Sequence, residues 1–364
     1  MVPGLVQHQH SAHHRFPVWW TGDGVTLEAS VESMVDSGIY DFKPYVHSDC
    51  GGDYRPTEGG DLLRWTEHCT FGTIFRYHGA EHQPWSYDTH TEDVIRSYLN
   101  IRYAFIPSLI AAAHVATLTA FPIVARCDLF FSENLPYASD NHQYLFLNDT
   151  LVAPIWDSTD NVTIRSVWIP PGQWQDAWSG EMVIGPQNIS VAQPYERIPL
   201  WHQEGGLIVM ASNPGIRVDR QDWSSLTLQA FPAINRSVVV HRTVYPQNDA
   251  TLAGKNTHLM METTDDGWVV LTIDPEVRAM VHHWVLRVHL AVDETMTELM
   301  IDEEPSVHKL HLIAPTLMAD VASFMPFGGP GTAPAPKAGP IAEILVPGTT
   351  GQCRVSMRVV LGLE

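Results

Sequence analysis

The sequence predicts an α/β region followed by all-β regions. Between His14 and His78, three short apolar runs each end in a polar, ionisable residue, and helical stripes separate them. Strands that alternate with helices favour a parallel sheet with right-handed crossovers. From Tyr144 onward, short apolar strands are separated by Asn-Asp, Pro-Gly and Gly-Gly punctuation, which is typical of antiparallel sheets.

The first helix is expected after Asp23. Thr26 is suited to cap its N-terminus, and Ser37-Gly38 is suited to end it. The apolar positions between them follow the helical spacing i, i+4, i+7 and i+8, at Leu27, Val31, Met34 and Val35.

A second strand and helix follow. Ile39 to Val46 is apolar enough for a strand, although Lys43-Pro44 weakens that prediction. A helix marked by Leu62, Trp65 and Cys69 comes next, and Thr73 to His78 is the third predicted strand. In such sheets ligands bind at the carboxyl ends of the strands. That is where the sequence places Asp23, Asp49 and His78.

A long helix is predicted from Thr91 to about Thr119. Thr91 is suited to cap it, and acidic residues follow at its positive end. Pro107 is expected to kink or break it. Farther on, Trp168, Trp174 and Trp178 are expected to fill a core or an interface, and an exposed sugar-binding platform is the alternative.

Several motifs resemble the family-31 glycoside hydrolases, which include α-glucosidases and α-xylosidases. They keep the family's order between Arg15 and Met210. The motifs are Trp20-x-Gly22-Asp23, Ser48-Asp49-x-Gly51-Gly52, Arg76-x-His78, Pro84-Trp85, Arg102-Tyr103-x-x-Ile106-Pro107-x-Leu109, Leu151-Val152-Ala153-Pro154, Ile169-Pro170-Pro171-Gly172-x-Trp174 and Glu196-Arg197-Ile198-Pro199-Leu200.

The resemblance implies roles for four residues. Asp23 matches the general acid/base, which needs a carboxyl kept protonated near neutral pH. Asp49 and His78 match residues that contact sugar hydroxyls, and Trp20 matches an aromatic wall of the same subsite. Plainer interpretations stay open: a turn or helix cap for Asp23, a turn for Asp49, a core histidine for His78 and core packing for Trp20. Trp65 and Trp85 are interpreted as core residues.

The resemblance also implies the domain organisation. A complete barrel needs eight βα units in about 250 residues, and only about three fit here. We therefore expect the last three units of a (β/α)8 TIM barrel, followed by two β-sandwich-like domains. The expected divisions are an unstructured segment 1–14, the C-terminal part of the catalytic barrel 15–126, a proximal β-sandwich 127–212 and a distal β-rich domain 213–364.

Two features depart from the family pattern. Retaining glycosidases need two carboxylates, and the family's nucleophile is an aspartate upstream of the acid/base. The 22 residues before Asp23 contain no Asp or Glu, so the nucleophile is expected to be absent from this chain. Gln7 stands where the family has an arginine. The chain is therefore expected to be the C-terminal part of a longer enzyme.

Composition limits the partners. The net charge of −20, from 21 basic and 41 acidic residues, disfavours nucleic acid and anionic membranes. No run of 18 apolar residues predicts a transmembrane span. Four histidines near the N-terminus are more consistent with a mobile segment than with a metal site: His8, His10, His13 and His14. No metal or organic cofactor is implied.

The cysteines and glycosylation motifs leave the compartment open. Cys50, Cys69, Cys127 and Cys353 show no metal spacing and define no disulfide framework. Four N-x-S/T sequons would be acceptor sites in a secreted protein: Asn148, Asn161, Asn188 and Asn235. No signal peptide is recognised near Met1.

The expected function is that of a retaining α-glycosidase acting on α-glucosides or α-xylosides. Because the nucleophile is missing, negligible hydrolysis is expected of this chain alone. The alternatives are a non-catalytic carbohydrate-binding or accessory protein and a remnant that partners a separate N-terminal half. Sugar and linkage specificity and oligomeric state stay open.

Overall fold

The computed structural model describes most of the chain. The described residues are 5–6, 18–41, 43–52, 59–78, 82–156, 162–233, 236–246, 255–276, 281, 283–291, 294–305, 311–313, 341–347 and 352–361. The four N-terminal histidines and the sequons at Asn161 and Asn235 lie outside them.

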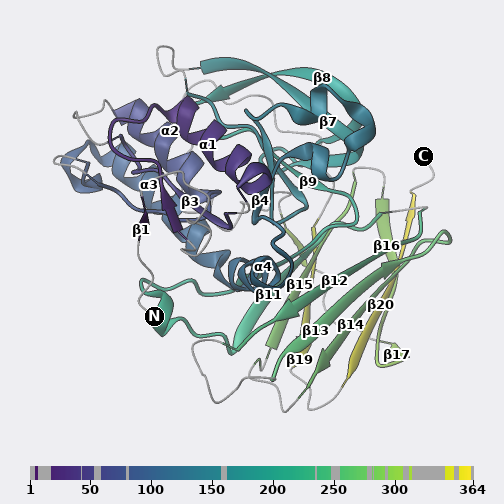
Figure 1. Ribbon diagram of the computed structural model, residues 1–364. Helices are drawn as coiled ribbons and strands as arrows, with labels where there is room; N and C mark the ends of the chain where they lie inside the picture. The colour runs from purple at the N-terminus through teal and green to yellow at the C-terminus, as the bar shows by residue number, and fades with distance from the viewer. Residues whose placement is uncertain are drawn as a thin grey trace.

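A three-stranded parallel sheet begins the fold (Figure 1). Its strands are β1 (Leu5–Val6), β2 (Val18–Trp20) and β3 (Tyr45–His47). Leu5–Val6 falls in the segment expected to be unstructured, and it pairs with β2, which would otherwise expose an unpaired edge. The third predicted strand is reduced, in the described residues, to a single parallel bridge between Cys50 and Tyr77.

Helices α1 (Leu27–Tyr40) and α2 (Gly59–Thr70) connect these strands. The predicted cap is confirmed, because Thr26 Oγ1 accepts a hydrogen bond from Ala29 N at 3.2 Å. The predicted stop at Ser37-Gly38 is wrong, since the helix continues for two more residues. Gly38 serves close packing instead: a Cβ there would lie 2.9 Å from Pro122 Cβ. Strand β3 is correspondingly shorter than the predicted Ile39 to Val46.

The long predicted helix is divided into α3 (Thr89–Ala104) and α4 (Ile106–Thr119), which are bent by 52°. The break at Phe105 precedes Pro107, as predicted. The predicted cap is wrong, since Asp88 and not Thr91 caps α3, its carboxylate accepting from Thr91 N at 3.0 Å. No single described helix is long and apolar enough to cross a membrane, and only the bent α3–α4 pair passes by length and composition.

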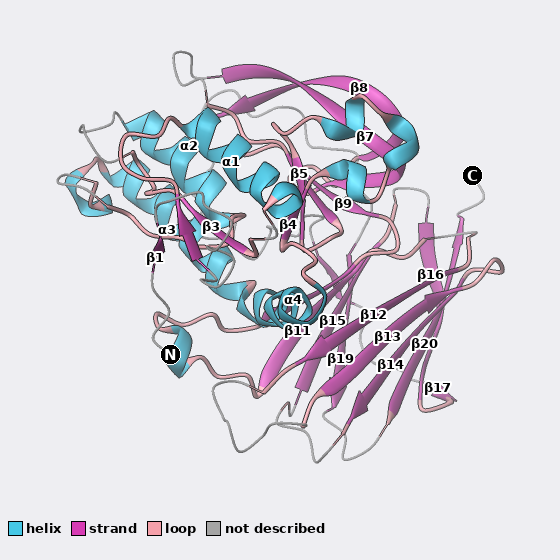
Figure 2. Ribbon diagram, viewed as in Figure 1, coloured by secondary structure: helices cyan, strands magenta, loops and turns pink. Residues whose placement is uncertain are grey.

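A six-stranded antiparallel sheet follows, in the order β4-β5-β6-β9-β7-β8 (Figure 2). Its last two strands in that order form a long two-stranded ribbon. The strands are β4 (Val124–Ala125), β5 (Tyr144–Phe146), β6 (Thr150–Val152), β7 (Val162–Asp176), β8 (Met182–Pro194) and β9 (Leu200–Gln203). Short 3-10 helices flank these elements: η2 (Pro84–Ser86), η3 (Cys127–Leu129), η4 (Ser132–Asn134), η5 (Tyr137–Ser139) and η6 (Val218–Arg220).

The C-terminal region contains two further sheets, whose inner faces share one apolar core. The five-stranded sheet has the order β10-β11-β15-β19-β18, with β10 (Leu207–Ala211), β11 (Ser225–Ala230), β15 (His283–His289), β19 (Ile341–Pro347) and β18 (His311–Ile313). The six-stranded sheet has the order β12-β13-β14-β20-β16-β17, with β12 (Val238–Val244), β13 (Thr257–Thr263), β14 (Trp268–Pro275), β20 (Cys353–Leu361), β16 (Glu294–Ile301) and β17 (Glu304–Pro305).

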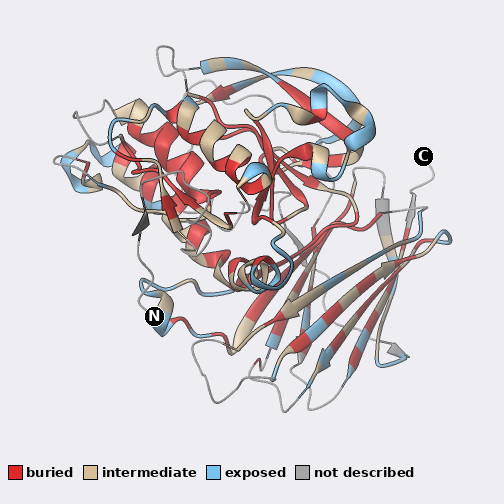
Figure 3. Cartoon of the chain, viewed as in Figure 1, coloured by how far each residue is buried: buried red, intermediate tan, exposed pale blue. Residues whose placement is uncertain are grey.

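Buried residues, red in Figure 3, run through both the helical part and the C-terminal sheets, and strand β10 and helix α4 contribute to the core of each. On β10, Ile208 and Met210 join the core beneath the helices, whereas Leu207 and Val209 join the core between the two C-terminal sheets. This alternation is what a strand with two buried faces requires. Helix α4 likewise places Leu109 in the first core and packs Ile110 against the second.

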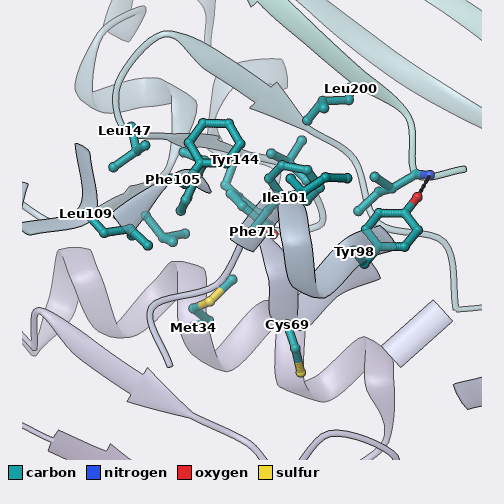
Figure 4. Packing of buried hydrophobic residues seen from close by; sticks show 14 of the residues in the cluster. Met34, Cys69, Phe71, Tyr98, Ile101, Phe105, Leu109, Tyr144, Leu147 and Leu200 are labelled. Carbon is teal, nitrogen blue, oxygen red and sulfur yellow. Dashed lines mark hydrogen bonds between the residues drawn. The ribbon is translucent and has the colours of Figure 1, made fainter. Parts of the chain in front are cut away.

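The first core joins the helices to the proximal sheet (Figure 4). Phe71, Phe105 and Phe146 meet edge to face, with ring centroids 5.6 to 6.1 Å apart. Helices therefore cover one face of the sheet β4-β5-β6-β9-β7-β8, where a β-sandwich would have its second sheet. Trp168 and Trp174 are buried on its other face and Trp178 in the first core, so the platform interpretation is wrong.

A buried disulfide joins Cys50, after β3, to Cys69 near the end of α2. The wide sequence spacing gave no sign of this pair. Cys127 and Cys353 are free and buried.

We expect the native protein to show no reactive thiol, two after denaturation without reductant and four after reduction. Because the bridge closes a loop with a sequence separation of 19, reduction should lower the free energy of unfolding by about 3 kcal/mol. Thiol titration and denaturant unfolding, each with and without reductant, measure these values. Four thiols in the unreduced, denatured protein would contradict the pairing.

Candidate active site

The loops after β2 and β3 lie side by side at the same end of the parallel sheet. Thr21 N donates to His47 O at 2.9 Å, and the hydroxyls of Thr21 and Ser48 are 2.8 Å apart. These bonds extend the pairing beyond the strand ends. They hold the backbone that leads to Asp23 beside the backbone that leads to Asp49.

Asp49 is the centre of the site and is 3% exposed. Its Oδ2 accepts from Trp20 Nε1 at 3.1 Å, and its Oδ1 lies 2.8 Å from His47 Nε2 and accepts from Arg76 Nε at 3.0 Å. Arg76 Nη2 also donates to Oδ1. His78 Nδ1 lies 3.4 Å from Oδ2. One carboxylate therefore holds side chains from the ends of β2 and β3 and from the segment that follows α2.

These contacts determine the charge of the site. Burial alone would raise the pKa of Asp49, but hydrogen bonds from Arg76 and His47 outweigh it and hold that pKa below its usual value. Burial lowers the pKa of His47 despite its bond to Asp49. Near neutral pH, Asp49 is ionised and His47 is neutral. A carboxylate only accepts hydrogen bonds, so His47 carries its proton on Nε2.

Asp23 and His78 form the exposed side of the site. Polar atoms of Asp23, Asp49 and His78 all lie within 4.8 Å of one another. Asp23 is not the helix cap, which is Thr26, and the His78 side chain, 45% exposed, is not a core histidine. Two carboxylates and an imidazole resemble a set of metal ligands, but Asp49 is already occupied by three side chains. Oδ2 of Asp49, which accepts one hydrogen bond from Trp20, together with Asp23 and His78, still offers acceptor positions to a hydroxyl group.

The four residues singled out from the sequence thus meet in one place. Two further residues, His47 and Arg76, were given no role from the sequence. Arg76 stands in the motif with His78, and His47 stands two residues before Asp49 at the end of β3, so both positions carried a signal. Trp65 is buried as expected, whereas Trp85 is 73% exposed and is not a core residue.

Known proteins resemble this chain in sequence. Residues 5–112 match the family model of the glycosyl hydrolases family 31 TIM-barrel domain, and residues 121–208 match the glycosyl hydrolase family 31 C-terminal domain. Alpha-glucosidase 2 of Bacillus thermoamyloliquefaciens is 28% identical over 214 residues, which are 55% of this chain and 26% of that protein. The alpha-xylosidase of Saccharolobus solfataricus is 23% identical over 241 residues, 63% of this chain and 32% of that protein.

Solved structures share the fold. A family-31 dextranase of Flavobacterium johnsoniae, solved as a mutant with isomaltotriose, superposes with a TM-score of 0.72 at 17% identity, covering 94% of this chain and 44% of that one. The cycloalternan-forming enzyme of Listeria monocytogenes, solved with a pentasaccharide substrate, gives 0.73 at 18% identity, covering 95% and 32%.

The chain spans 26% and 32% of the two curated relatives. The two family models together match more than half of its residues. The chain belongs to glycosyl hydrolase family 31.

Proposed function

We propose that this chain carries the acid/base half of a retaining α-glycosidase site for α-glucosides or α-xylosides. The observation that carries the proposal is the meeting of Asp23, Asp49 and His78 within 4.8 Å at the carboxyl end of parallel strands. The names of the alpha-glucosidase and alpha-xylosidase relatives support this choice of sugars.

We propose a domain organisation that agrees with this function. Residues 15–126 would be the last three units of a TIM barrel, 127–212 a proximal and 213–364 a distal sandwich-like domain, and 1–14 the segment before them. The pairing of β10 with β11 supports a distal domain that begins a few residues earlier. On this proposal the chain is the C-terminal part of a longer enzyme.

Each residue has a chemical task. Arg76 and His47 fix the charge of the ionised Asp49 and occupy its Oδ1. Its Oδ2, which accepts one hydrogen bond from Trp20, therefore takes one from a sugar hydroxyl. Asp23, at the exposed edge, gives its proton to the leaving glycosidic oxygen and then takes one from the attacking water. His78 contacts a hydroxyl of the same sugar.

The second carboxylate of a retaining reaction must attack the anomeric carbon. Asp49 is unsuited to that task, because its Oδ1 is held by His47 and Arg76 and its Oδ2 by Trp20. No Asp or Glu precedes Asp23 in the sequence given. We therefore propose that this polypeptide binds the sugar and hydrolyses it negligibly.

Titration of the purified chain with glucose, xylose and a methyl α-glucoside tests the site. We expect saturable binding that Asp49→Asn weakens by about 10-fold or more, the equivalent of one charge-assisted hydrogen bond. His78→Gln, at an exposed position, should weaken it without a risk to folding. Asp274→Asn, on the exposed side of β14, is the matched control and should leave binding unchanged.

The outcomes separate the alternatives. Absence of sugar binding by the wild-type chain, or equal binding by Asp49→Asn, would contradict the proposed binding site. Turnover of an aryl α-glucoside that is lost in Asp23→Asn would support the acid/base role and contradict the negligible activity. Binding without turnover that Asp23→Asn leaves unchanged would favour a non-catalytic carbohydrate-binding or accessory protein.

A further inference from the structure

Two of the four sequons lie within the described residues, and their surroundings differ. Asn148-Asp149-Thr150 leads into β6, and Asn188-Ile189-Ser190 lies in the middle of β8. The motif alone is a weak predictor, because it is common by chance. The structure adds the environment of each asparagine and of the hydroxyl two residues later.

The first sequon is built into the interior. Thr150 is fully buried, and its hydroxyl lies 3.1 Å from His202 Nδ1. Asp149 is buried and receives a 2.6 Å bond from Arg242 Nη2. Asn148 lines a cavity of about 220 Å3 between α4 and β12. Asn148 is half-buried beside these groups, so a glycan there would crowd the cavity wall and disturb the contacts of Asp149 and Thr150.

The second sequon is open. Asn188 and Ser190 are both exposed. In the described part of the chain β8 is an edge strand of its sheet, and Figure 3 shows much of it in the pale blue of exposed residues. Asn188 pairs with Trp168 of β7 through the backbone, which leaves its side-chain amide outside the strand ladder. A sugar attached there displaces no buried group.

The disulfide is an independent observation. A buried bridge between Cys50 and Cys69 forms and persists in an oxidising environment, such as the secretory pathway. N-linked glycosylation takes place in that compartment. The pairing and the open sequon therefore indicate the same location, without reference to the glycosidase site.

We propose that Asn188 is an N-glycosylation site and that Asn148 is not. In the modification, the side-chain amide nitrogen of Asn188 attacks C1 of a lipid-pyrophosphate-linked oligosaccharide. The C1–N bond forms, the C1–O bond to the pyrophosphate breaks, the amide gives up one proton, and the lipid pyrophosphate leaves. The host's oligosaccharyl transferase supplies the catalysis.

The position gives the glycan a physical task. The β7–β8 ribbon exposes apolar side chains, with Ile164 73% and Ile184 64% exposed. Its outer strand also presents backbone groups that a second chain can pair with. A bulky, hydrated sugar in the middle of β8 would prevent such pairing along the edge.

To test this, the full chain is expressed behind a cleavable leader in a eukaryotic secretory host. Glycopeptide mass spectrometry then measures the occupancy of each sequon in all chains that enter the secretory pathway. Mapping assigns each glycan to its own asparagine, so Asn161 and Asn235 do not interfere. We expect Asn188 to be modified in most folded chains and Asn148 in almost none. Ser190→Ala should abolish the glycan on Asn188, and Ser190→Thr should retain it.

Two results would overturn the proposal. One is an unmodified Asn188 in chains whose cysteines 50 and 69 are oxidised. The other is equal occupancy of Asn148 and Asn188 in chains that resist proteolysis, since folding would then tolerate a sugar beside the cavity. Neither result depends on sugar binding or turnover, so the glycosidase proposal stands or fails separately.

Discussion

Replacing Arg64 with methionine is expected to lower the free energy of unfolding by about 3–5 kcal/mol. Arg64, 1% exposed on α2, donates to Glu67 Oε2 at 3.1 Å and to the carbonyl oxygens of Gln193 and Arg197. Tyr98 OH also donates, to Glu67 Oε1 at 3.3 Å. Without Arg64, the buried Glu67 keeps its bond from Tyr98 but loses the one from Arg64, and the two carbonyl oxygens lose theirs. Denaturant unfolding of wild type and variant measures the difference.

The double variant Arg64→Met/Glu67→Leu distinguishes the energy of the buried ion pair from the energy of side-chain packing. It removes both ionisable groups, so we expect it to be less destabilised than the sum of the single variants by about 2 kcal/mol. Arg96→Met on α3 is the matched control, since Arg96 pairs with Glu92 on the surface. That change should stay within about 0.5 kcal/mol. Additive effects at Arg64 and Glu67 would contradict the buried pair.

Acidification from pH 8 to pH 5 is expected to remove about 4 kcal/mol of stability through His68 and His202, and His289 acts in the same direction. Burial lowers the pKa of His68 and of His202 to about 3 and holds that of His289 well below its usual value. The unfolded chain binds protons near pH 6.5 and the folded chain does not. The contribution of these histidines is therefore full above pH 6.5 and falls as the pH drops, by about 2 kcal/mol each for His68 and His202 at pH 5.

Carboxyl groups with raised pKa values act in the opposite direction. Burial raises the pKa of Glu67 to about 8, so its contribution decreases as the pH rises. The histidine effect is isolated by comparing unfolding at pH 5 and pH 8 in wild type and in His202→Phe. We expect the variant to lose about 2 kcal/mol less over this range. His283→Gln, at an exposed position of β15, is the control. Equal losses in wild type and His202→Phe would contradict a neutral buried His202.

Local chemistry made the helices predictable. Thr26 caps α1 because a hydroxyl before an apolar stripe is a local signal, and Pro107 interrupts α3–α4 because its ring cannot continue a helix. The predicted helix end at Gly38 was wrong because a glycine can mark either a helix end or a close contact. Only the position of Pro122, more than 80 residues later, distinguishes the two.

The site was predictable as positions but not as a network. Asp23, Asp49 and His78 follow strand ends, and parallel strands bring such ends together. The buried bond from His47 to Asp49 depends on which way two side chains turn, and no spacing rule gives that. The sequence placed β10 in the proximal domain together with its neighbours along the chain, because Leu207 to Ala211 is apolar at every position. A strand that is buried on both faces does not reveal which sheet it joins.

Strand β10 and helix α4 also determine how the protein unfolds. Each contributes side chains to the core beneath the helices and to the core between the C-terminal sheets. Opening either core uncovers part of the other, so the two regions do not have separate stabilities. The Ser108 hydroxyl of α4, which donates to Val209 O at 2.8 Å and accepts from Val209 N at 3.1 Å, links the helix directly to this strand. We therefore expect the helical and C-terminal parts to form one cooperative unit, in which amide protons of both exchange with the same opening event.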